Sequence, residues 1–419
     1  MGQGDGQQPF WGLASRRGRG SRVLAWAAIA LAVVLVGGVL TAYTIYSDVF
    51  GKIRHVKVTG LGARPPSYNR SLNILVIGSD TRSGGNKRFG AHVTGQRSDT
   101  VLVLHLSPGR RRAVVLSIPR DSVVPVLSCP SAPGAQGQAA APGQVEQINA
   151  TFSAGGPGCL WKTVEHTTGI RLNHFMELNF TSFEHVVNDI GGVDICLPYP
   201  IRDRRSKLRL SAGIHHVMGP AALAYWRVRY IGQGSDLQRI QRDQYLMASL
   251  AQKVKRANLL RSPTRILKVV SDIADALTTD AGLSQGAMIG LAAQLRSLPL
   301  NAVHFVQVPV DFYGPNPSWV QWAPTARTLF QAIARDRKLP GMRHEKPSAL
   351  RHSSAHGAGE AATAPPRPKS PSPAASSPSG GHGGHAPSLS GLSRRFGGIT
   401  AGANVCRDSA AFTGPLGGH

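Results

Sequence analysis

Acidic residues, cysteines and several familiar enzyme motifs are scarce or absent in this sequence. Asp and Glu together number 22 against 47 Lys and Arg, and the formal net charge is +25. A charge of this size favours anionic partners such as nucleic acid, anionic lipid or phosphorylated substrates. The four cysteines are too few for a disulfide-built scaffold, and none forms the C-x-x-C pair typical of zinc sites.

Nucleotide-binding and zinc-protease signatures are missing as well. The chain contains no G-x-x-x-x-G-K-[ST] loop, no G-x-G-x-x-G after a predicted strand and no H-E-x-x-H. Nucleotide-binding folds and metalloproteases of that type therefore have no support. The hydrophobic fraction, 42%, is still large enough for a buried core, so the chain as a whole is not disordered.

One uncharged run, residues 23–46, predicts a transmembrane helix. At ~1.5 Å per residue, the run crosses a ~30 Å hydrocarbon layer with some tilt. Four arginines precede the run and Asp48 follows it, so the positive-inside rule places the N-terminus in the cytoplasm. A cleaved signal peptide is the alternative, but the run is long for one and no A-x-A site follows. We therefore expect a single-pass protein of the cell membrane.

Composition divides the chain into five segments. They are a basic cytoplasmic stub (1–22), the transmembrane helix (23–46), a juxtamembrane connector (47–70), an extracytoplasmic catalytic domain (71–337) and a tail (338–419). The tail is rich in Pro, Ser, Gly and His and is predicted to be disordered.

Short apolar runs alternate with amphipathic helical patterns in the main domain. The runs 72–78, 100–106, 113–118, 174–180 and 302–310 are nearly continuous, as expected of strands buried on both faces. Helical patterns cover 145–154, 158–168, 181–190, 236–256, 263–277 and 285–297. The alternation predicts an α/β fold, a three-layer αβα domain with a central mixed sheet, preceded by one transmembrane helix.

Charged residues stand at the ends of the first three predicted strands. Asp80 and Arg82 follow the first strand, Asp99 precedes the second, and Arg120 and Asp121 follow the third. Ligands of open α/β sheets bind at the carboxyl ends of strands, so we expect these side chains to share one rim. A turn or cap explains each motif taken alone. Together they favour carboxylates that hold a hard cation and arginines that hold phosphate.

A second group of arginines lies further along the chain. Arg227 and Arg229 are two residues apart and share a face if the segment is extended. Arg239 and Arg242 follow on one face of a predicted helix. Guanidinium groups bind phosphate oxygens bidentately and keep their charge, so these arginines predict a phosphate clamp. A surface helix with local ion pairs is the alternative.

Two cysteines bracket an insertion rich in Pro, Gly and Gln, residues 129–146. An exported domain can form disulfides. We therefore predict a Cys129–Cys159 disulfide that closes this loop.

The motifs in their order resemble the LytR–CpsA–Psr family of cell-wall polymer ligases. The matching stretches are N-I-L-V-I-G-S-D-T-R (73–82), R-S-D-T (97–100), S-I-P-R-D (117–121), I-N-A (148–150), G-G-V-D-I-C (191–196) and the segment 219–244. Each stretch is weak alone, whereas the ordered set is specific and covers most of residues 72–256.

The resemblance implies a phosphotransferase of the membrane surface. Its substrate is an anionic glycopolymer on a polyprenyl-pyrophosphate carrier, its acceptor is a hydroxyl of peptidoglycan, and its cofactor is Mg²⁺ or another divalent cation such as Mn²⁺. No nucleic acid is expected as a partner. The resemblance implies Asp80 and Asp99 as metal ligands and Asp99, Arg120 and Asp121 as catalytic residues, with Asp99 or Asp121 as the base. The residues implied to bind pyrophosphate are Arg82, Arg120, Arg227, Arg229, Arg239, Arg242 and Gln244.

Two positions depart from the family pattern. Gln147 stands where a lysine often precedes the I-N-A motif, so one phosphate contact is either missing or supplied by Arg82 or Lys162. Asp243 stands where the family prefers glutamine, which leaves the role of that position open.

Three other functions are compatible with the same features. A hydrolase would cleave the polyprenyl pyrophosphate with water as the acceptor, and acceptor dependence separates it from a ligase. A non-enzymatic wall-binding protein would only grip anionic polymers and would tolerate single Asp or Arg changes. A membrane-tethered regulator is opposed by the predicted topology and by the short cytoplasmic stub. The sequence does not identify the polymer.

Overall fold

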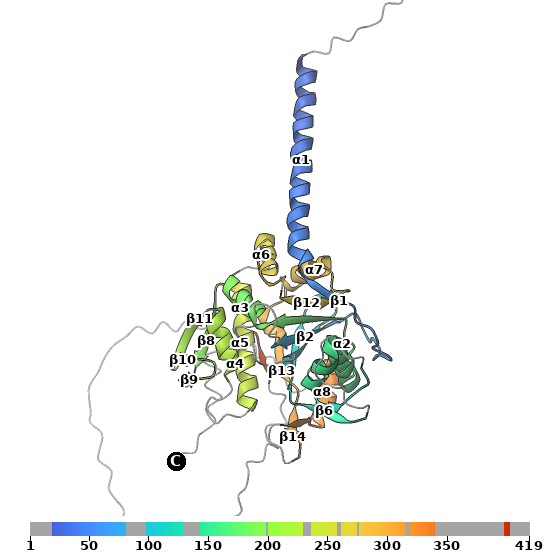
Figure 1. Cartoon of the computed structure of the whole chain (residues 1–419), viewed down its shortest axis with the longest axis vertical. Coiled ribbons are helices and arrows are strands. Elements are labelled where there is room, and N and C mark those ends of the chain that lie inside the picture. Colours follow the sequence, from blue (N-terminus) through green and yellow to red (C-terminus); the bar gives the residue numbers. More distant parts are fainter. Residues whose placement is uncertain are drawn as a thin grey trace, which may run out of the picture.

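The computed structural model describes residues 19–80, 98–129, 143–197, 200–228, 236–257, 261–274, 276–314, 319–339 and 398–402. A long helix, α1 (Arg19–Gly51), leads into a layered body with helices on both sides of a central sheet (Figure 1). The expected α/β class with a mixed central sheet is confirmed.

Eight strands form the central sheet, in the order β1-β12-β7-β2-β3-β4-β13-β16. Their bounds are β1 (Arg54–Val56), β2 (Leu72–Ser79), β3 (Ser98–Leu106), β4 (Ala113–Ile118), β7 (His174–Asn179), β12 (Leu277–Asp280), β13 (Val303–Gln307) and β16 (Gly398–Thr400). The pairs β1–β12, β7–β2 and β4–β13 are parallel and the other neighbours are antiparallel. The five apolar runs of the sequence thus become β2, β3, β4, β7 and β13.

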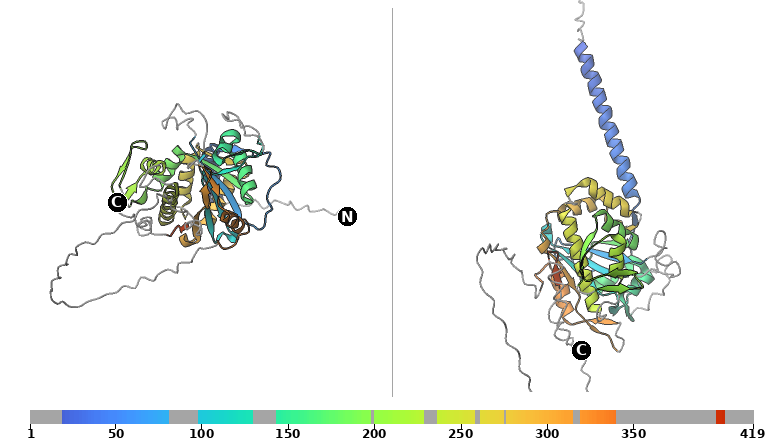
Figure 2. Two further views of the ribbon diagram at one scale, coloured as in Figure 1. Left: turned by 90° about the horizontal axis from the view of Figure 1, so that it is seen from below. Right: turned by 90° about the vertical axis from the view of Figure 1, so that its left-hand side faces the viewer.

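Helices cover both faces of this sheet (Figures 1 and 2). On one face, α2 (Ile148–Thr168) and α8 (Thr325–Ala334) bury Phe152 and Leu329 against Leu75 and Phe175 of the strands. On the other face lie α3 (Phe180–Asp189) and α5 (Asp236–Arg256), where Ala248 packs on Phe305. The two cores fix the strand ends, from which the candidate site is built.

Smaller elements complete the body. The remaining helices are α4 (Gly219–Arg227), α6 (Pro263–Ala274) and α7 (Gln285–Leu295). Four two-stranded sheets pair β5 (Val123–Pro125) with β6 (Val145–Gln147), β8 (Val193–Leu197) with β11 (Gly213–Val217), β9 (Ile201–Asp203) with β10 (Leu208–Leu210), and β14 (Val310–Phe312) with β15 (Val320–Trp322).

The predicted membrane span falls on α1. Within the residues that the structure describes, no helix has the length and apolarity needed to cross a membrane. Some side chains of the predicted span, including those of residues 23–25, lie outside the described set.

The segment expected to be a connector is instead part of the folded body. β1 pairs with β12 at the edge of the central sheet. Arg64 donates to both carboxylate oxygens of Glu165 on α2 and to the carbonyl oxygen of Leu172, and it lies over the Trp161 ring. Glu165 is only 3% exposed, and the Arg64 guanidinium supplies its matching charge. The folded unit therefore begins before residue 71.

Part of the predicted disordered tail belongs to the sheet as well. β16 pairs antiparallel with β13, and Ala401 is fully buried beside Ala248 and Phe305. The carbonyl oxygen of Ala401 accepts a hydrogen bond of 2.9 Å from the side-chain amide of Gln252. The expectation of disorder from residue 338 onward is therefore wrong for 398–402; the intervening residues 340–397 lie outside the described set.

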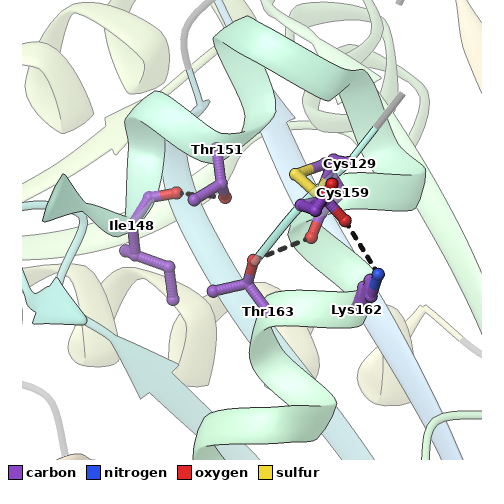
Figure 3. Close-up of a disulfide and its surroundings, with 7 residues drawn as sticks. Cys129, Ile148, Thr151, Cys159, Lys162 and Thr163 are labelled. Carbon is purple, nitrogen blue, oxygen red and sulfur yellow. Dashed lines mark hydrogen bonds between the residues drawn. A yellow bond between two sulfur atoms is a disulfide. The ribbon is translucent and has the colours of Figure 1, made fainter. Parts of the chain in front are cut away.

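The predicted Cys129–Cys159 disulfide is present (Figure 3). Cys159 lies on α2, where Gly156 takes a positive φ of 66° just before Pro157. These two residues break the helix into the two patterns that the sequence indicates. Cys196 is disulfide-bonded too.

The carboxylate of Asp280 joins β12 to β7. It accepts hydrogen bonds of 2.9 Å from the backbone N–H groups of Phe175 and Gly282, and it lies 2.9 Å from Nδ1 of His174. Burial disfavours its charge, but these hydrogen bonds outweigh burial and hold the pKa of Asp280 below its usual value.

Candidate active site

The register of the central sheet brings the first three charged motifs to one edge. Ser79 ends β2 and pairs with Ser98, the first residue of β3, and Val101 pairs with Ile118 at the end of β4. Asp99 and the segment that follows Ile118 therefore meet at the same edge. The expectation of one rim holds for Asp99, Arg120 and Asp121.

Arg120 is the centre of this rim. Its Nη1 donates to Oδ1 of Asp99, and its Nε lies 3.4 Å from Oδ2 of Asp121. The Arg120 side chain is only 18% exposed. Burial disfavours its charge, yet the two carboxylates outweigh burial and raise the pKa of Arg120. Arg120 is thus a fixed cation held between two anions.

Gln147 completes the support of the rim from β6. Its Nε2 donates to Oδ1 of Asp121 over 3.2 Å, and the backbone N–H of Asn149 donates to the carbonyl oxygen of Arg120 over 3.2 Å. The residue that departs from the family pattern therefore orients a site carboxylate. Lys162 does not replace the missing lysine here, because its Nζ donates to the carbonyl oxygen of Ser128 beside the disulfide (Figure 3).

Arg227 reaches the same edge from α4. Its guanidinium carbon lies 5.1 Å from the centroid of the Phe180 ring. Phe180 directly follows Asn179, which pairs in register with Ser79. The end of α4 is thereby placed beside the end of β2.

The start of α5 carries the next members of the predicted clamp. Arg242 lies 5.5 Å from the Tyr225 ring centroid and donates to the carbonyl oxygen of Val228. Burial raises the pKa of Tyr225, although the charge of Arg242 works against that rise. Gln244 is 6% exposed, and its side-chain nitrogen has no hydrogen-bond partner among the described residues. α5 thus locks the end of α4, which carries Arg227.

Three residues of the predicted site cannot be placed. Arg82 and Arg229 lie outside the described residues, and Arg239 is described only as part of the backbone of α5.

The sequence reading missed Glu177. This residue lies on β7 opposite Ile77, and its carboxyl group hydrogen-bonds with Ser79. Burial raises the pKa of Glu177, with smaller opposing contributions from Ser79 and from the charge of Arg54. A single acidic residue among apolar residues, one histidine and one asparagine in the stretch H-F-M-E-L-N-F was the signal that could have revealed it.

A divalent cation is compatible with the residues present. No group of three or more His, Cys, Asp or Glu that could hold a metal occurs in the described part of the chain. Asp80 follows the last residue of β2 and Asp99 is the second residue of β3, and these two strands are antiparallel neighbours. Two carboxylates suit Mg²⁺, which keeps several waters and takes the rest of its ligands from substrate phosphates.

The edge therefore combines fixed cations with hydrogen-bonding carboxylates. Arg120 and Arg227 present positive charge that cannot be lost near pH 7, which suits binding of phosphate oxygens. Asp99 and Asp121 are the acceptors closest to that charge. Such an arrangement can stabilise negative charge that develops on a phosphoryl group.

Comparisons with known proteins identify relatives of this chain. The model of the LytR_cpsA_psr family matches residues 43–333. The "Probable cell wall biosynthesis protein LcpB" of Corynebacterium glutamicum is 31% identical over 272 residues, which are 63% of this chain and 61% of that protein. The "Polyisoprenyl-teichoic acid--peptidoglycan teichoic acid transferase TagU" of Bacillus cereus is 24% identical over 314 residues, 73% of this chain and 93% of that protein.

A solved structure shares the fold. The LytR-Csp2A-Psr enzyme from Actinomyces oris superposes with a TM-score of 0.51 at 19% identity, covering 67% of this chain and 96% of that one.

Proposed function

Because the chain belongs to the LytR_cpsA_psr family, we propose that it is a membrane-anchored phosphotransferase of the cell wall. It moves an anionic glycopolymer from a polyprenyl-pyrophosphate carrier to a hydroxyl of peptidoglycan. The observation that carries this proposal is Arg120, held between Asp99 and Asp121 at the edge of the sheet. The names of relatives as a teichoic acid transferase and a cell wall biosynthesis protein support it.

The reaction breaks the phosphoanhydride bond of the donor and forms a phosphodiester bond to the acceptor. The acceptor oxygen attacks the phosphorus next to the glycopolymer, and the bond from that phosphorus to the bridging oxygen breaks. Polyprenyl phosphate leaves with the bond's electron pair. Arg120 and Arg227 bind the non-bridging oxygens and the leaving phosphate, whose charge increases during the step.

The proton of the acceptor hydroxyl needs a base at the same edge. We assign Asp121 to this role, because Gln147 and Arg120 orient its carboxylate while Asp99 is assigned to the cation. Asp80 and Asp99 would hold Mg²⁺ or Mn²⁺, which would neutralise part of the pyrophosphate charge.

The proposed anchor rests on the uncharged run of residues 23–46 and the arginines before it. It places the N-terminus in the cytoplasm and the sheet domain outside the cell. An anchored enzyme and a lipid-linked donor would share one membrane plane, which shortens the search between them.

The test uses the full chain in lipid nanodiscs with a polyprenyl-pyrophosphate-linked donor, peptidoglycan and Mg²⁺. We expect transfer of polymer to peptidoglycan, lowered about 10²–10³-fold by Arg120→Gln. Asp99→Asn should cause a comparable loss. Asp194→Asn is the matched control, because Asp194 is 59% exposed and pairs only with His216 on the β8–β11 hairpin among the described residues.

Each other outcome points to a different function. Release of polyprenyl phosphate that does not depend on peptidoglycan would identify a pyrophosphate hydrolase. No turnover, with unchanged binding of anionic polymer by both site variants, would leave a wall-binding or regulatory protein. Turnover that is unaffected by chelation of divalent cations would remove the proposed cofactor while leaving the transferase.

A further inference from the structure

The β9–β10 hairpin carries a group of exposed positive charges outside the candidate site. Its exposed basic residues are Arg202, Arg204, Arg205, Lys207 and Arg209. None of the five forms a salt bridge or side-chain hydrogen bond with the residues that the structure describes. Their charge is therefore offered to solvent.

The hairpin places two of these charges directly against each other. Arg202 and Arg209 are register partners across the antiparallel pair, and both are exposed. Like charges directly opposite each other destabilise a strand pair. The nearby Asp203 carboxylate accepts the backbone N–H groups of Arg205 and Ser206, at 3.1 and 3.3 Å, and it also interacts electrostatically with Arg205.

The turn holds a second unfavourable feature. Lys207 has a φ of 57°, in the left-handed region that glycine adopts without strain. A lysine there has a conformational cost that a glycine would avoid. Lys207 thus adds a fifth exposed positive charge to the hairpin at a position whose backbone conformation favours glycine.

The hairpin is firmly attached to the element that carries Arg227. Ile201 and Leu208 are buried in one apolar cluster with Tyr225 and Val228, at the end of α4. The hairpin is thus packed against the end of α4, the helix that carries Arg227. It lies on the flank of the body, apart from the place where α1 meets α6 and α7 (Figure 1), so a lipid surface around α1 would not be its partner.

We propose that the β9–β10 hairpin binds the anionic polymer of the donor beyond its pyrophosphate end. The ligand is a chain with repeating phosphate or carboxylate groups, whose spacing lets several charges meet the five cations at once. This inference rests on the proposed function for the identity of its ligand. It adds a binding site that selects long, charged donors over short ones.

The test compares two variants with the same net charge. The hairpin variant combines Arg202→Gln, Arg204→Gln, Arg205→Gln and Arg209→Gln. The control variant combines Arg256→Gln, Arg261→Gln, Arg265→Gln and Arg296→Gln, which are exposed residues on and beside α5, α6 and α7. Both are made in the full chain, and urea unfolding checks that both remain folded.

The probes are a defined glycerol-phosphate oligomer, a polyuronate and duplex DNA of matched length. We expect the hairpin variant to bind one of the two polymers about tenfold more weakly or worse, and the control variant to change less than twofold. Equal losses in both variants would overturn the proposal, since only net charge would matter. Tighter hairpin-dependent binding of DNA than of either polymer would also overturn it.

Turnover separates this inference from the proposed function. With a donor of one repeat unit, we expect both variants to match the unmodified chain; with a long donor, only the hairpin variant should show a raised KM. An unchanged KM of the hairpin variant for long donors would refute the inference and leave the transferase. Hairpin-dependent polymer binding without turnover of any donor would refute the transferase and retain the binding site.

Discussion

The α2 side of the molecule and the β9–β10 hairpin use arginine in opposite ways. The Arg64 guanidinium on the α2 side donates to two oxygens of Glu165 and to a backbone carbonyl oxygen, and it lies over an aromatic ring. The arginines of the hairpin face solvent, and two of them face each other. Arg64 therefore stabilises the fold through its internal partners, whereas the exposed arginines of the hairpin keep their charge available to a ligand.

Arg120 lies between these extremes. It has two carboxylate partners, like Arg64, but both stand at the edge of the sheet and are 26% and 29% exposed. Its environment holds the guanidinium in place without enclosing it. That combination suits a residue that must contact a substrate and keep its orientation between turnovers.

A large effect is expected for the Arg64–Glu165 pair on the α2 side. Glu165→Gln removes the charge that matches Arg64 and should lower the free energy of unfolding by about 3 kcal/mol, because a largely buried cation loses its partner. Urea unfolding of the full chain at pH 7 measures it. The exposed pair Asp194–His216 supplies the contrast, since Asp194→Asn should change stability by less than about 1 kcal/mol. Similar losses in the two variants would contradict the distinction.

The disulfide tests the α2 side from another direction. Replacing both Cys129 and Cys159 by serine should cost ~3–4 kcal/mol, since the bond closes a loop with a sequence separation of 30. Reduction of the unmodified chain also breaks the disulfide of Cys196, so the reduced unmodified chain is compared with the reduced double variant, and the two urea midpoints should then be similar. A double variant as stable as the parent would show that the packing of α2 alone holds the insertion.

Acid should weaken carboxylates that are held by hydrogen bonds in the fold, such as that of Asp280. The pKa of Asp280 is held below its ordinary value of about 4, so its stabilising contribution is complete above that value and is lost as pH falls through the lower folded value. Asp280→Asn should therefore cost about 1–2 kcal/mol at pH 7 and less near pH 3. Unfolding curves at the two pH values check the sign. A loss that grows on acidification would disprove the assignment.

The smallest expected effect on stability concerns the β9–β10 hairpin. Arg209→Gln removes one of two opposed charges and should leave stability unchanged or raise it by about 0.5 kcal/mol. The same change should weaken polymer binding, so a loss of binding should occur without a loss of stability. A clear loss of stability would mean that Arg209 supports the fold and would blur the contrast with Arg64.

The sequence indicates most of the main body. Nearly continuous apolar runs predict β2, β3, β4, β7 and β13, because strands buried on both faces leave no polar alternation. The helical period predicts α5 with its observed bounds, Asp236–Arg256. Long elements with a strong pattern are visible because their burial is dictated by residues close in sequence.

The misses share a physical cause, which is pairing between distant segments. The helical pattern 263–277 runs past the observed end of α6 at Ala274 to the first residue of β12, and β1 and β16 lie in the segments expected to be a connector and a tail. Each is only three or four residues long, and each becomes a strand only because an edge of the sheet offers hydrogen bonds. Local composition carries no trace of such a partner.

The sequence predicts that Asp99, Arg120 and Asp121 meet at one rim, but not the residues that support them. Arg120 and Asp99 follow from motifs at strand ends. Gln147 stands where the family often has a lysine, and its hydrogen bond to Asp121 depends on the β5–β6 pairing, which joins segments distant in sequence. Glu177 is visible only when the register sets it one strand away from Ser79.

The short junction between α1 and the sheet has a mechanical consequence. Only Lys52 and Ile53 separate α1 from β1, and Ile53 is 4% exposed in an apolar cluster with Ile273 and Leu277. A joint this short and this well packed removes most rotational freedom between helix and domain. In an anchored protein, the rim would keep a constant height and orientation. Lateral diffusion and rotation about the membrane normal would then be the main motions left for finding a lipid-linked donor.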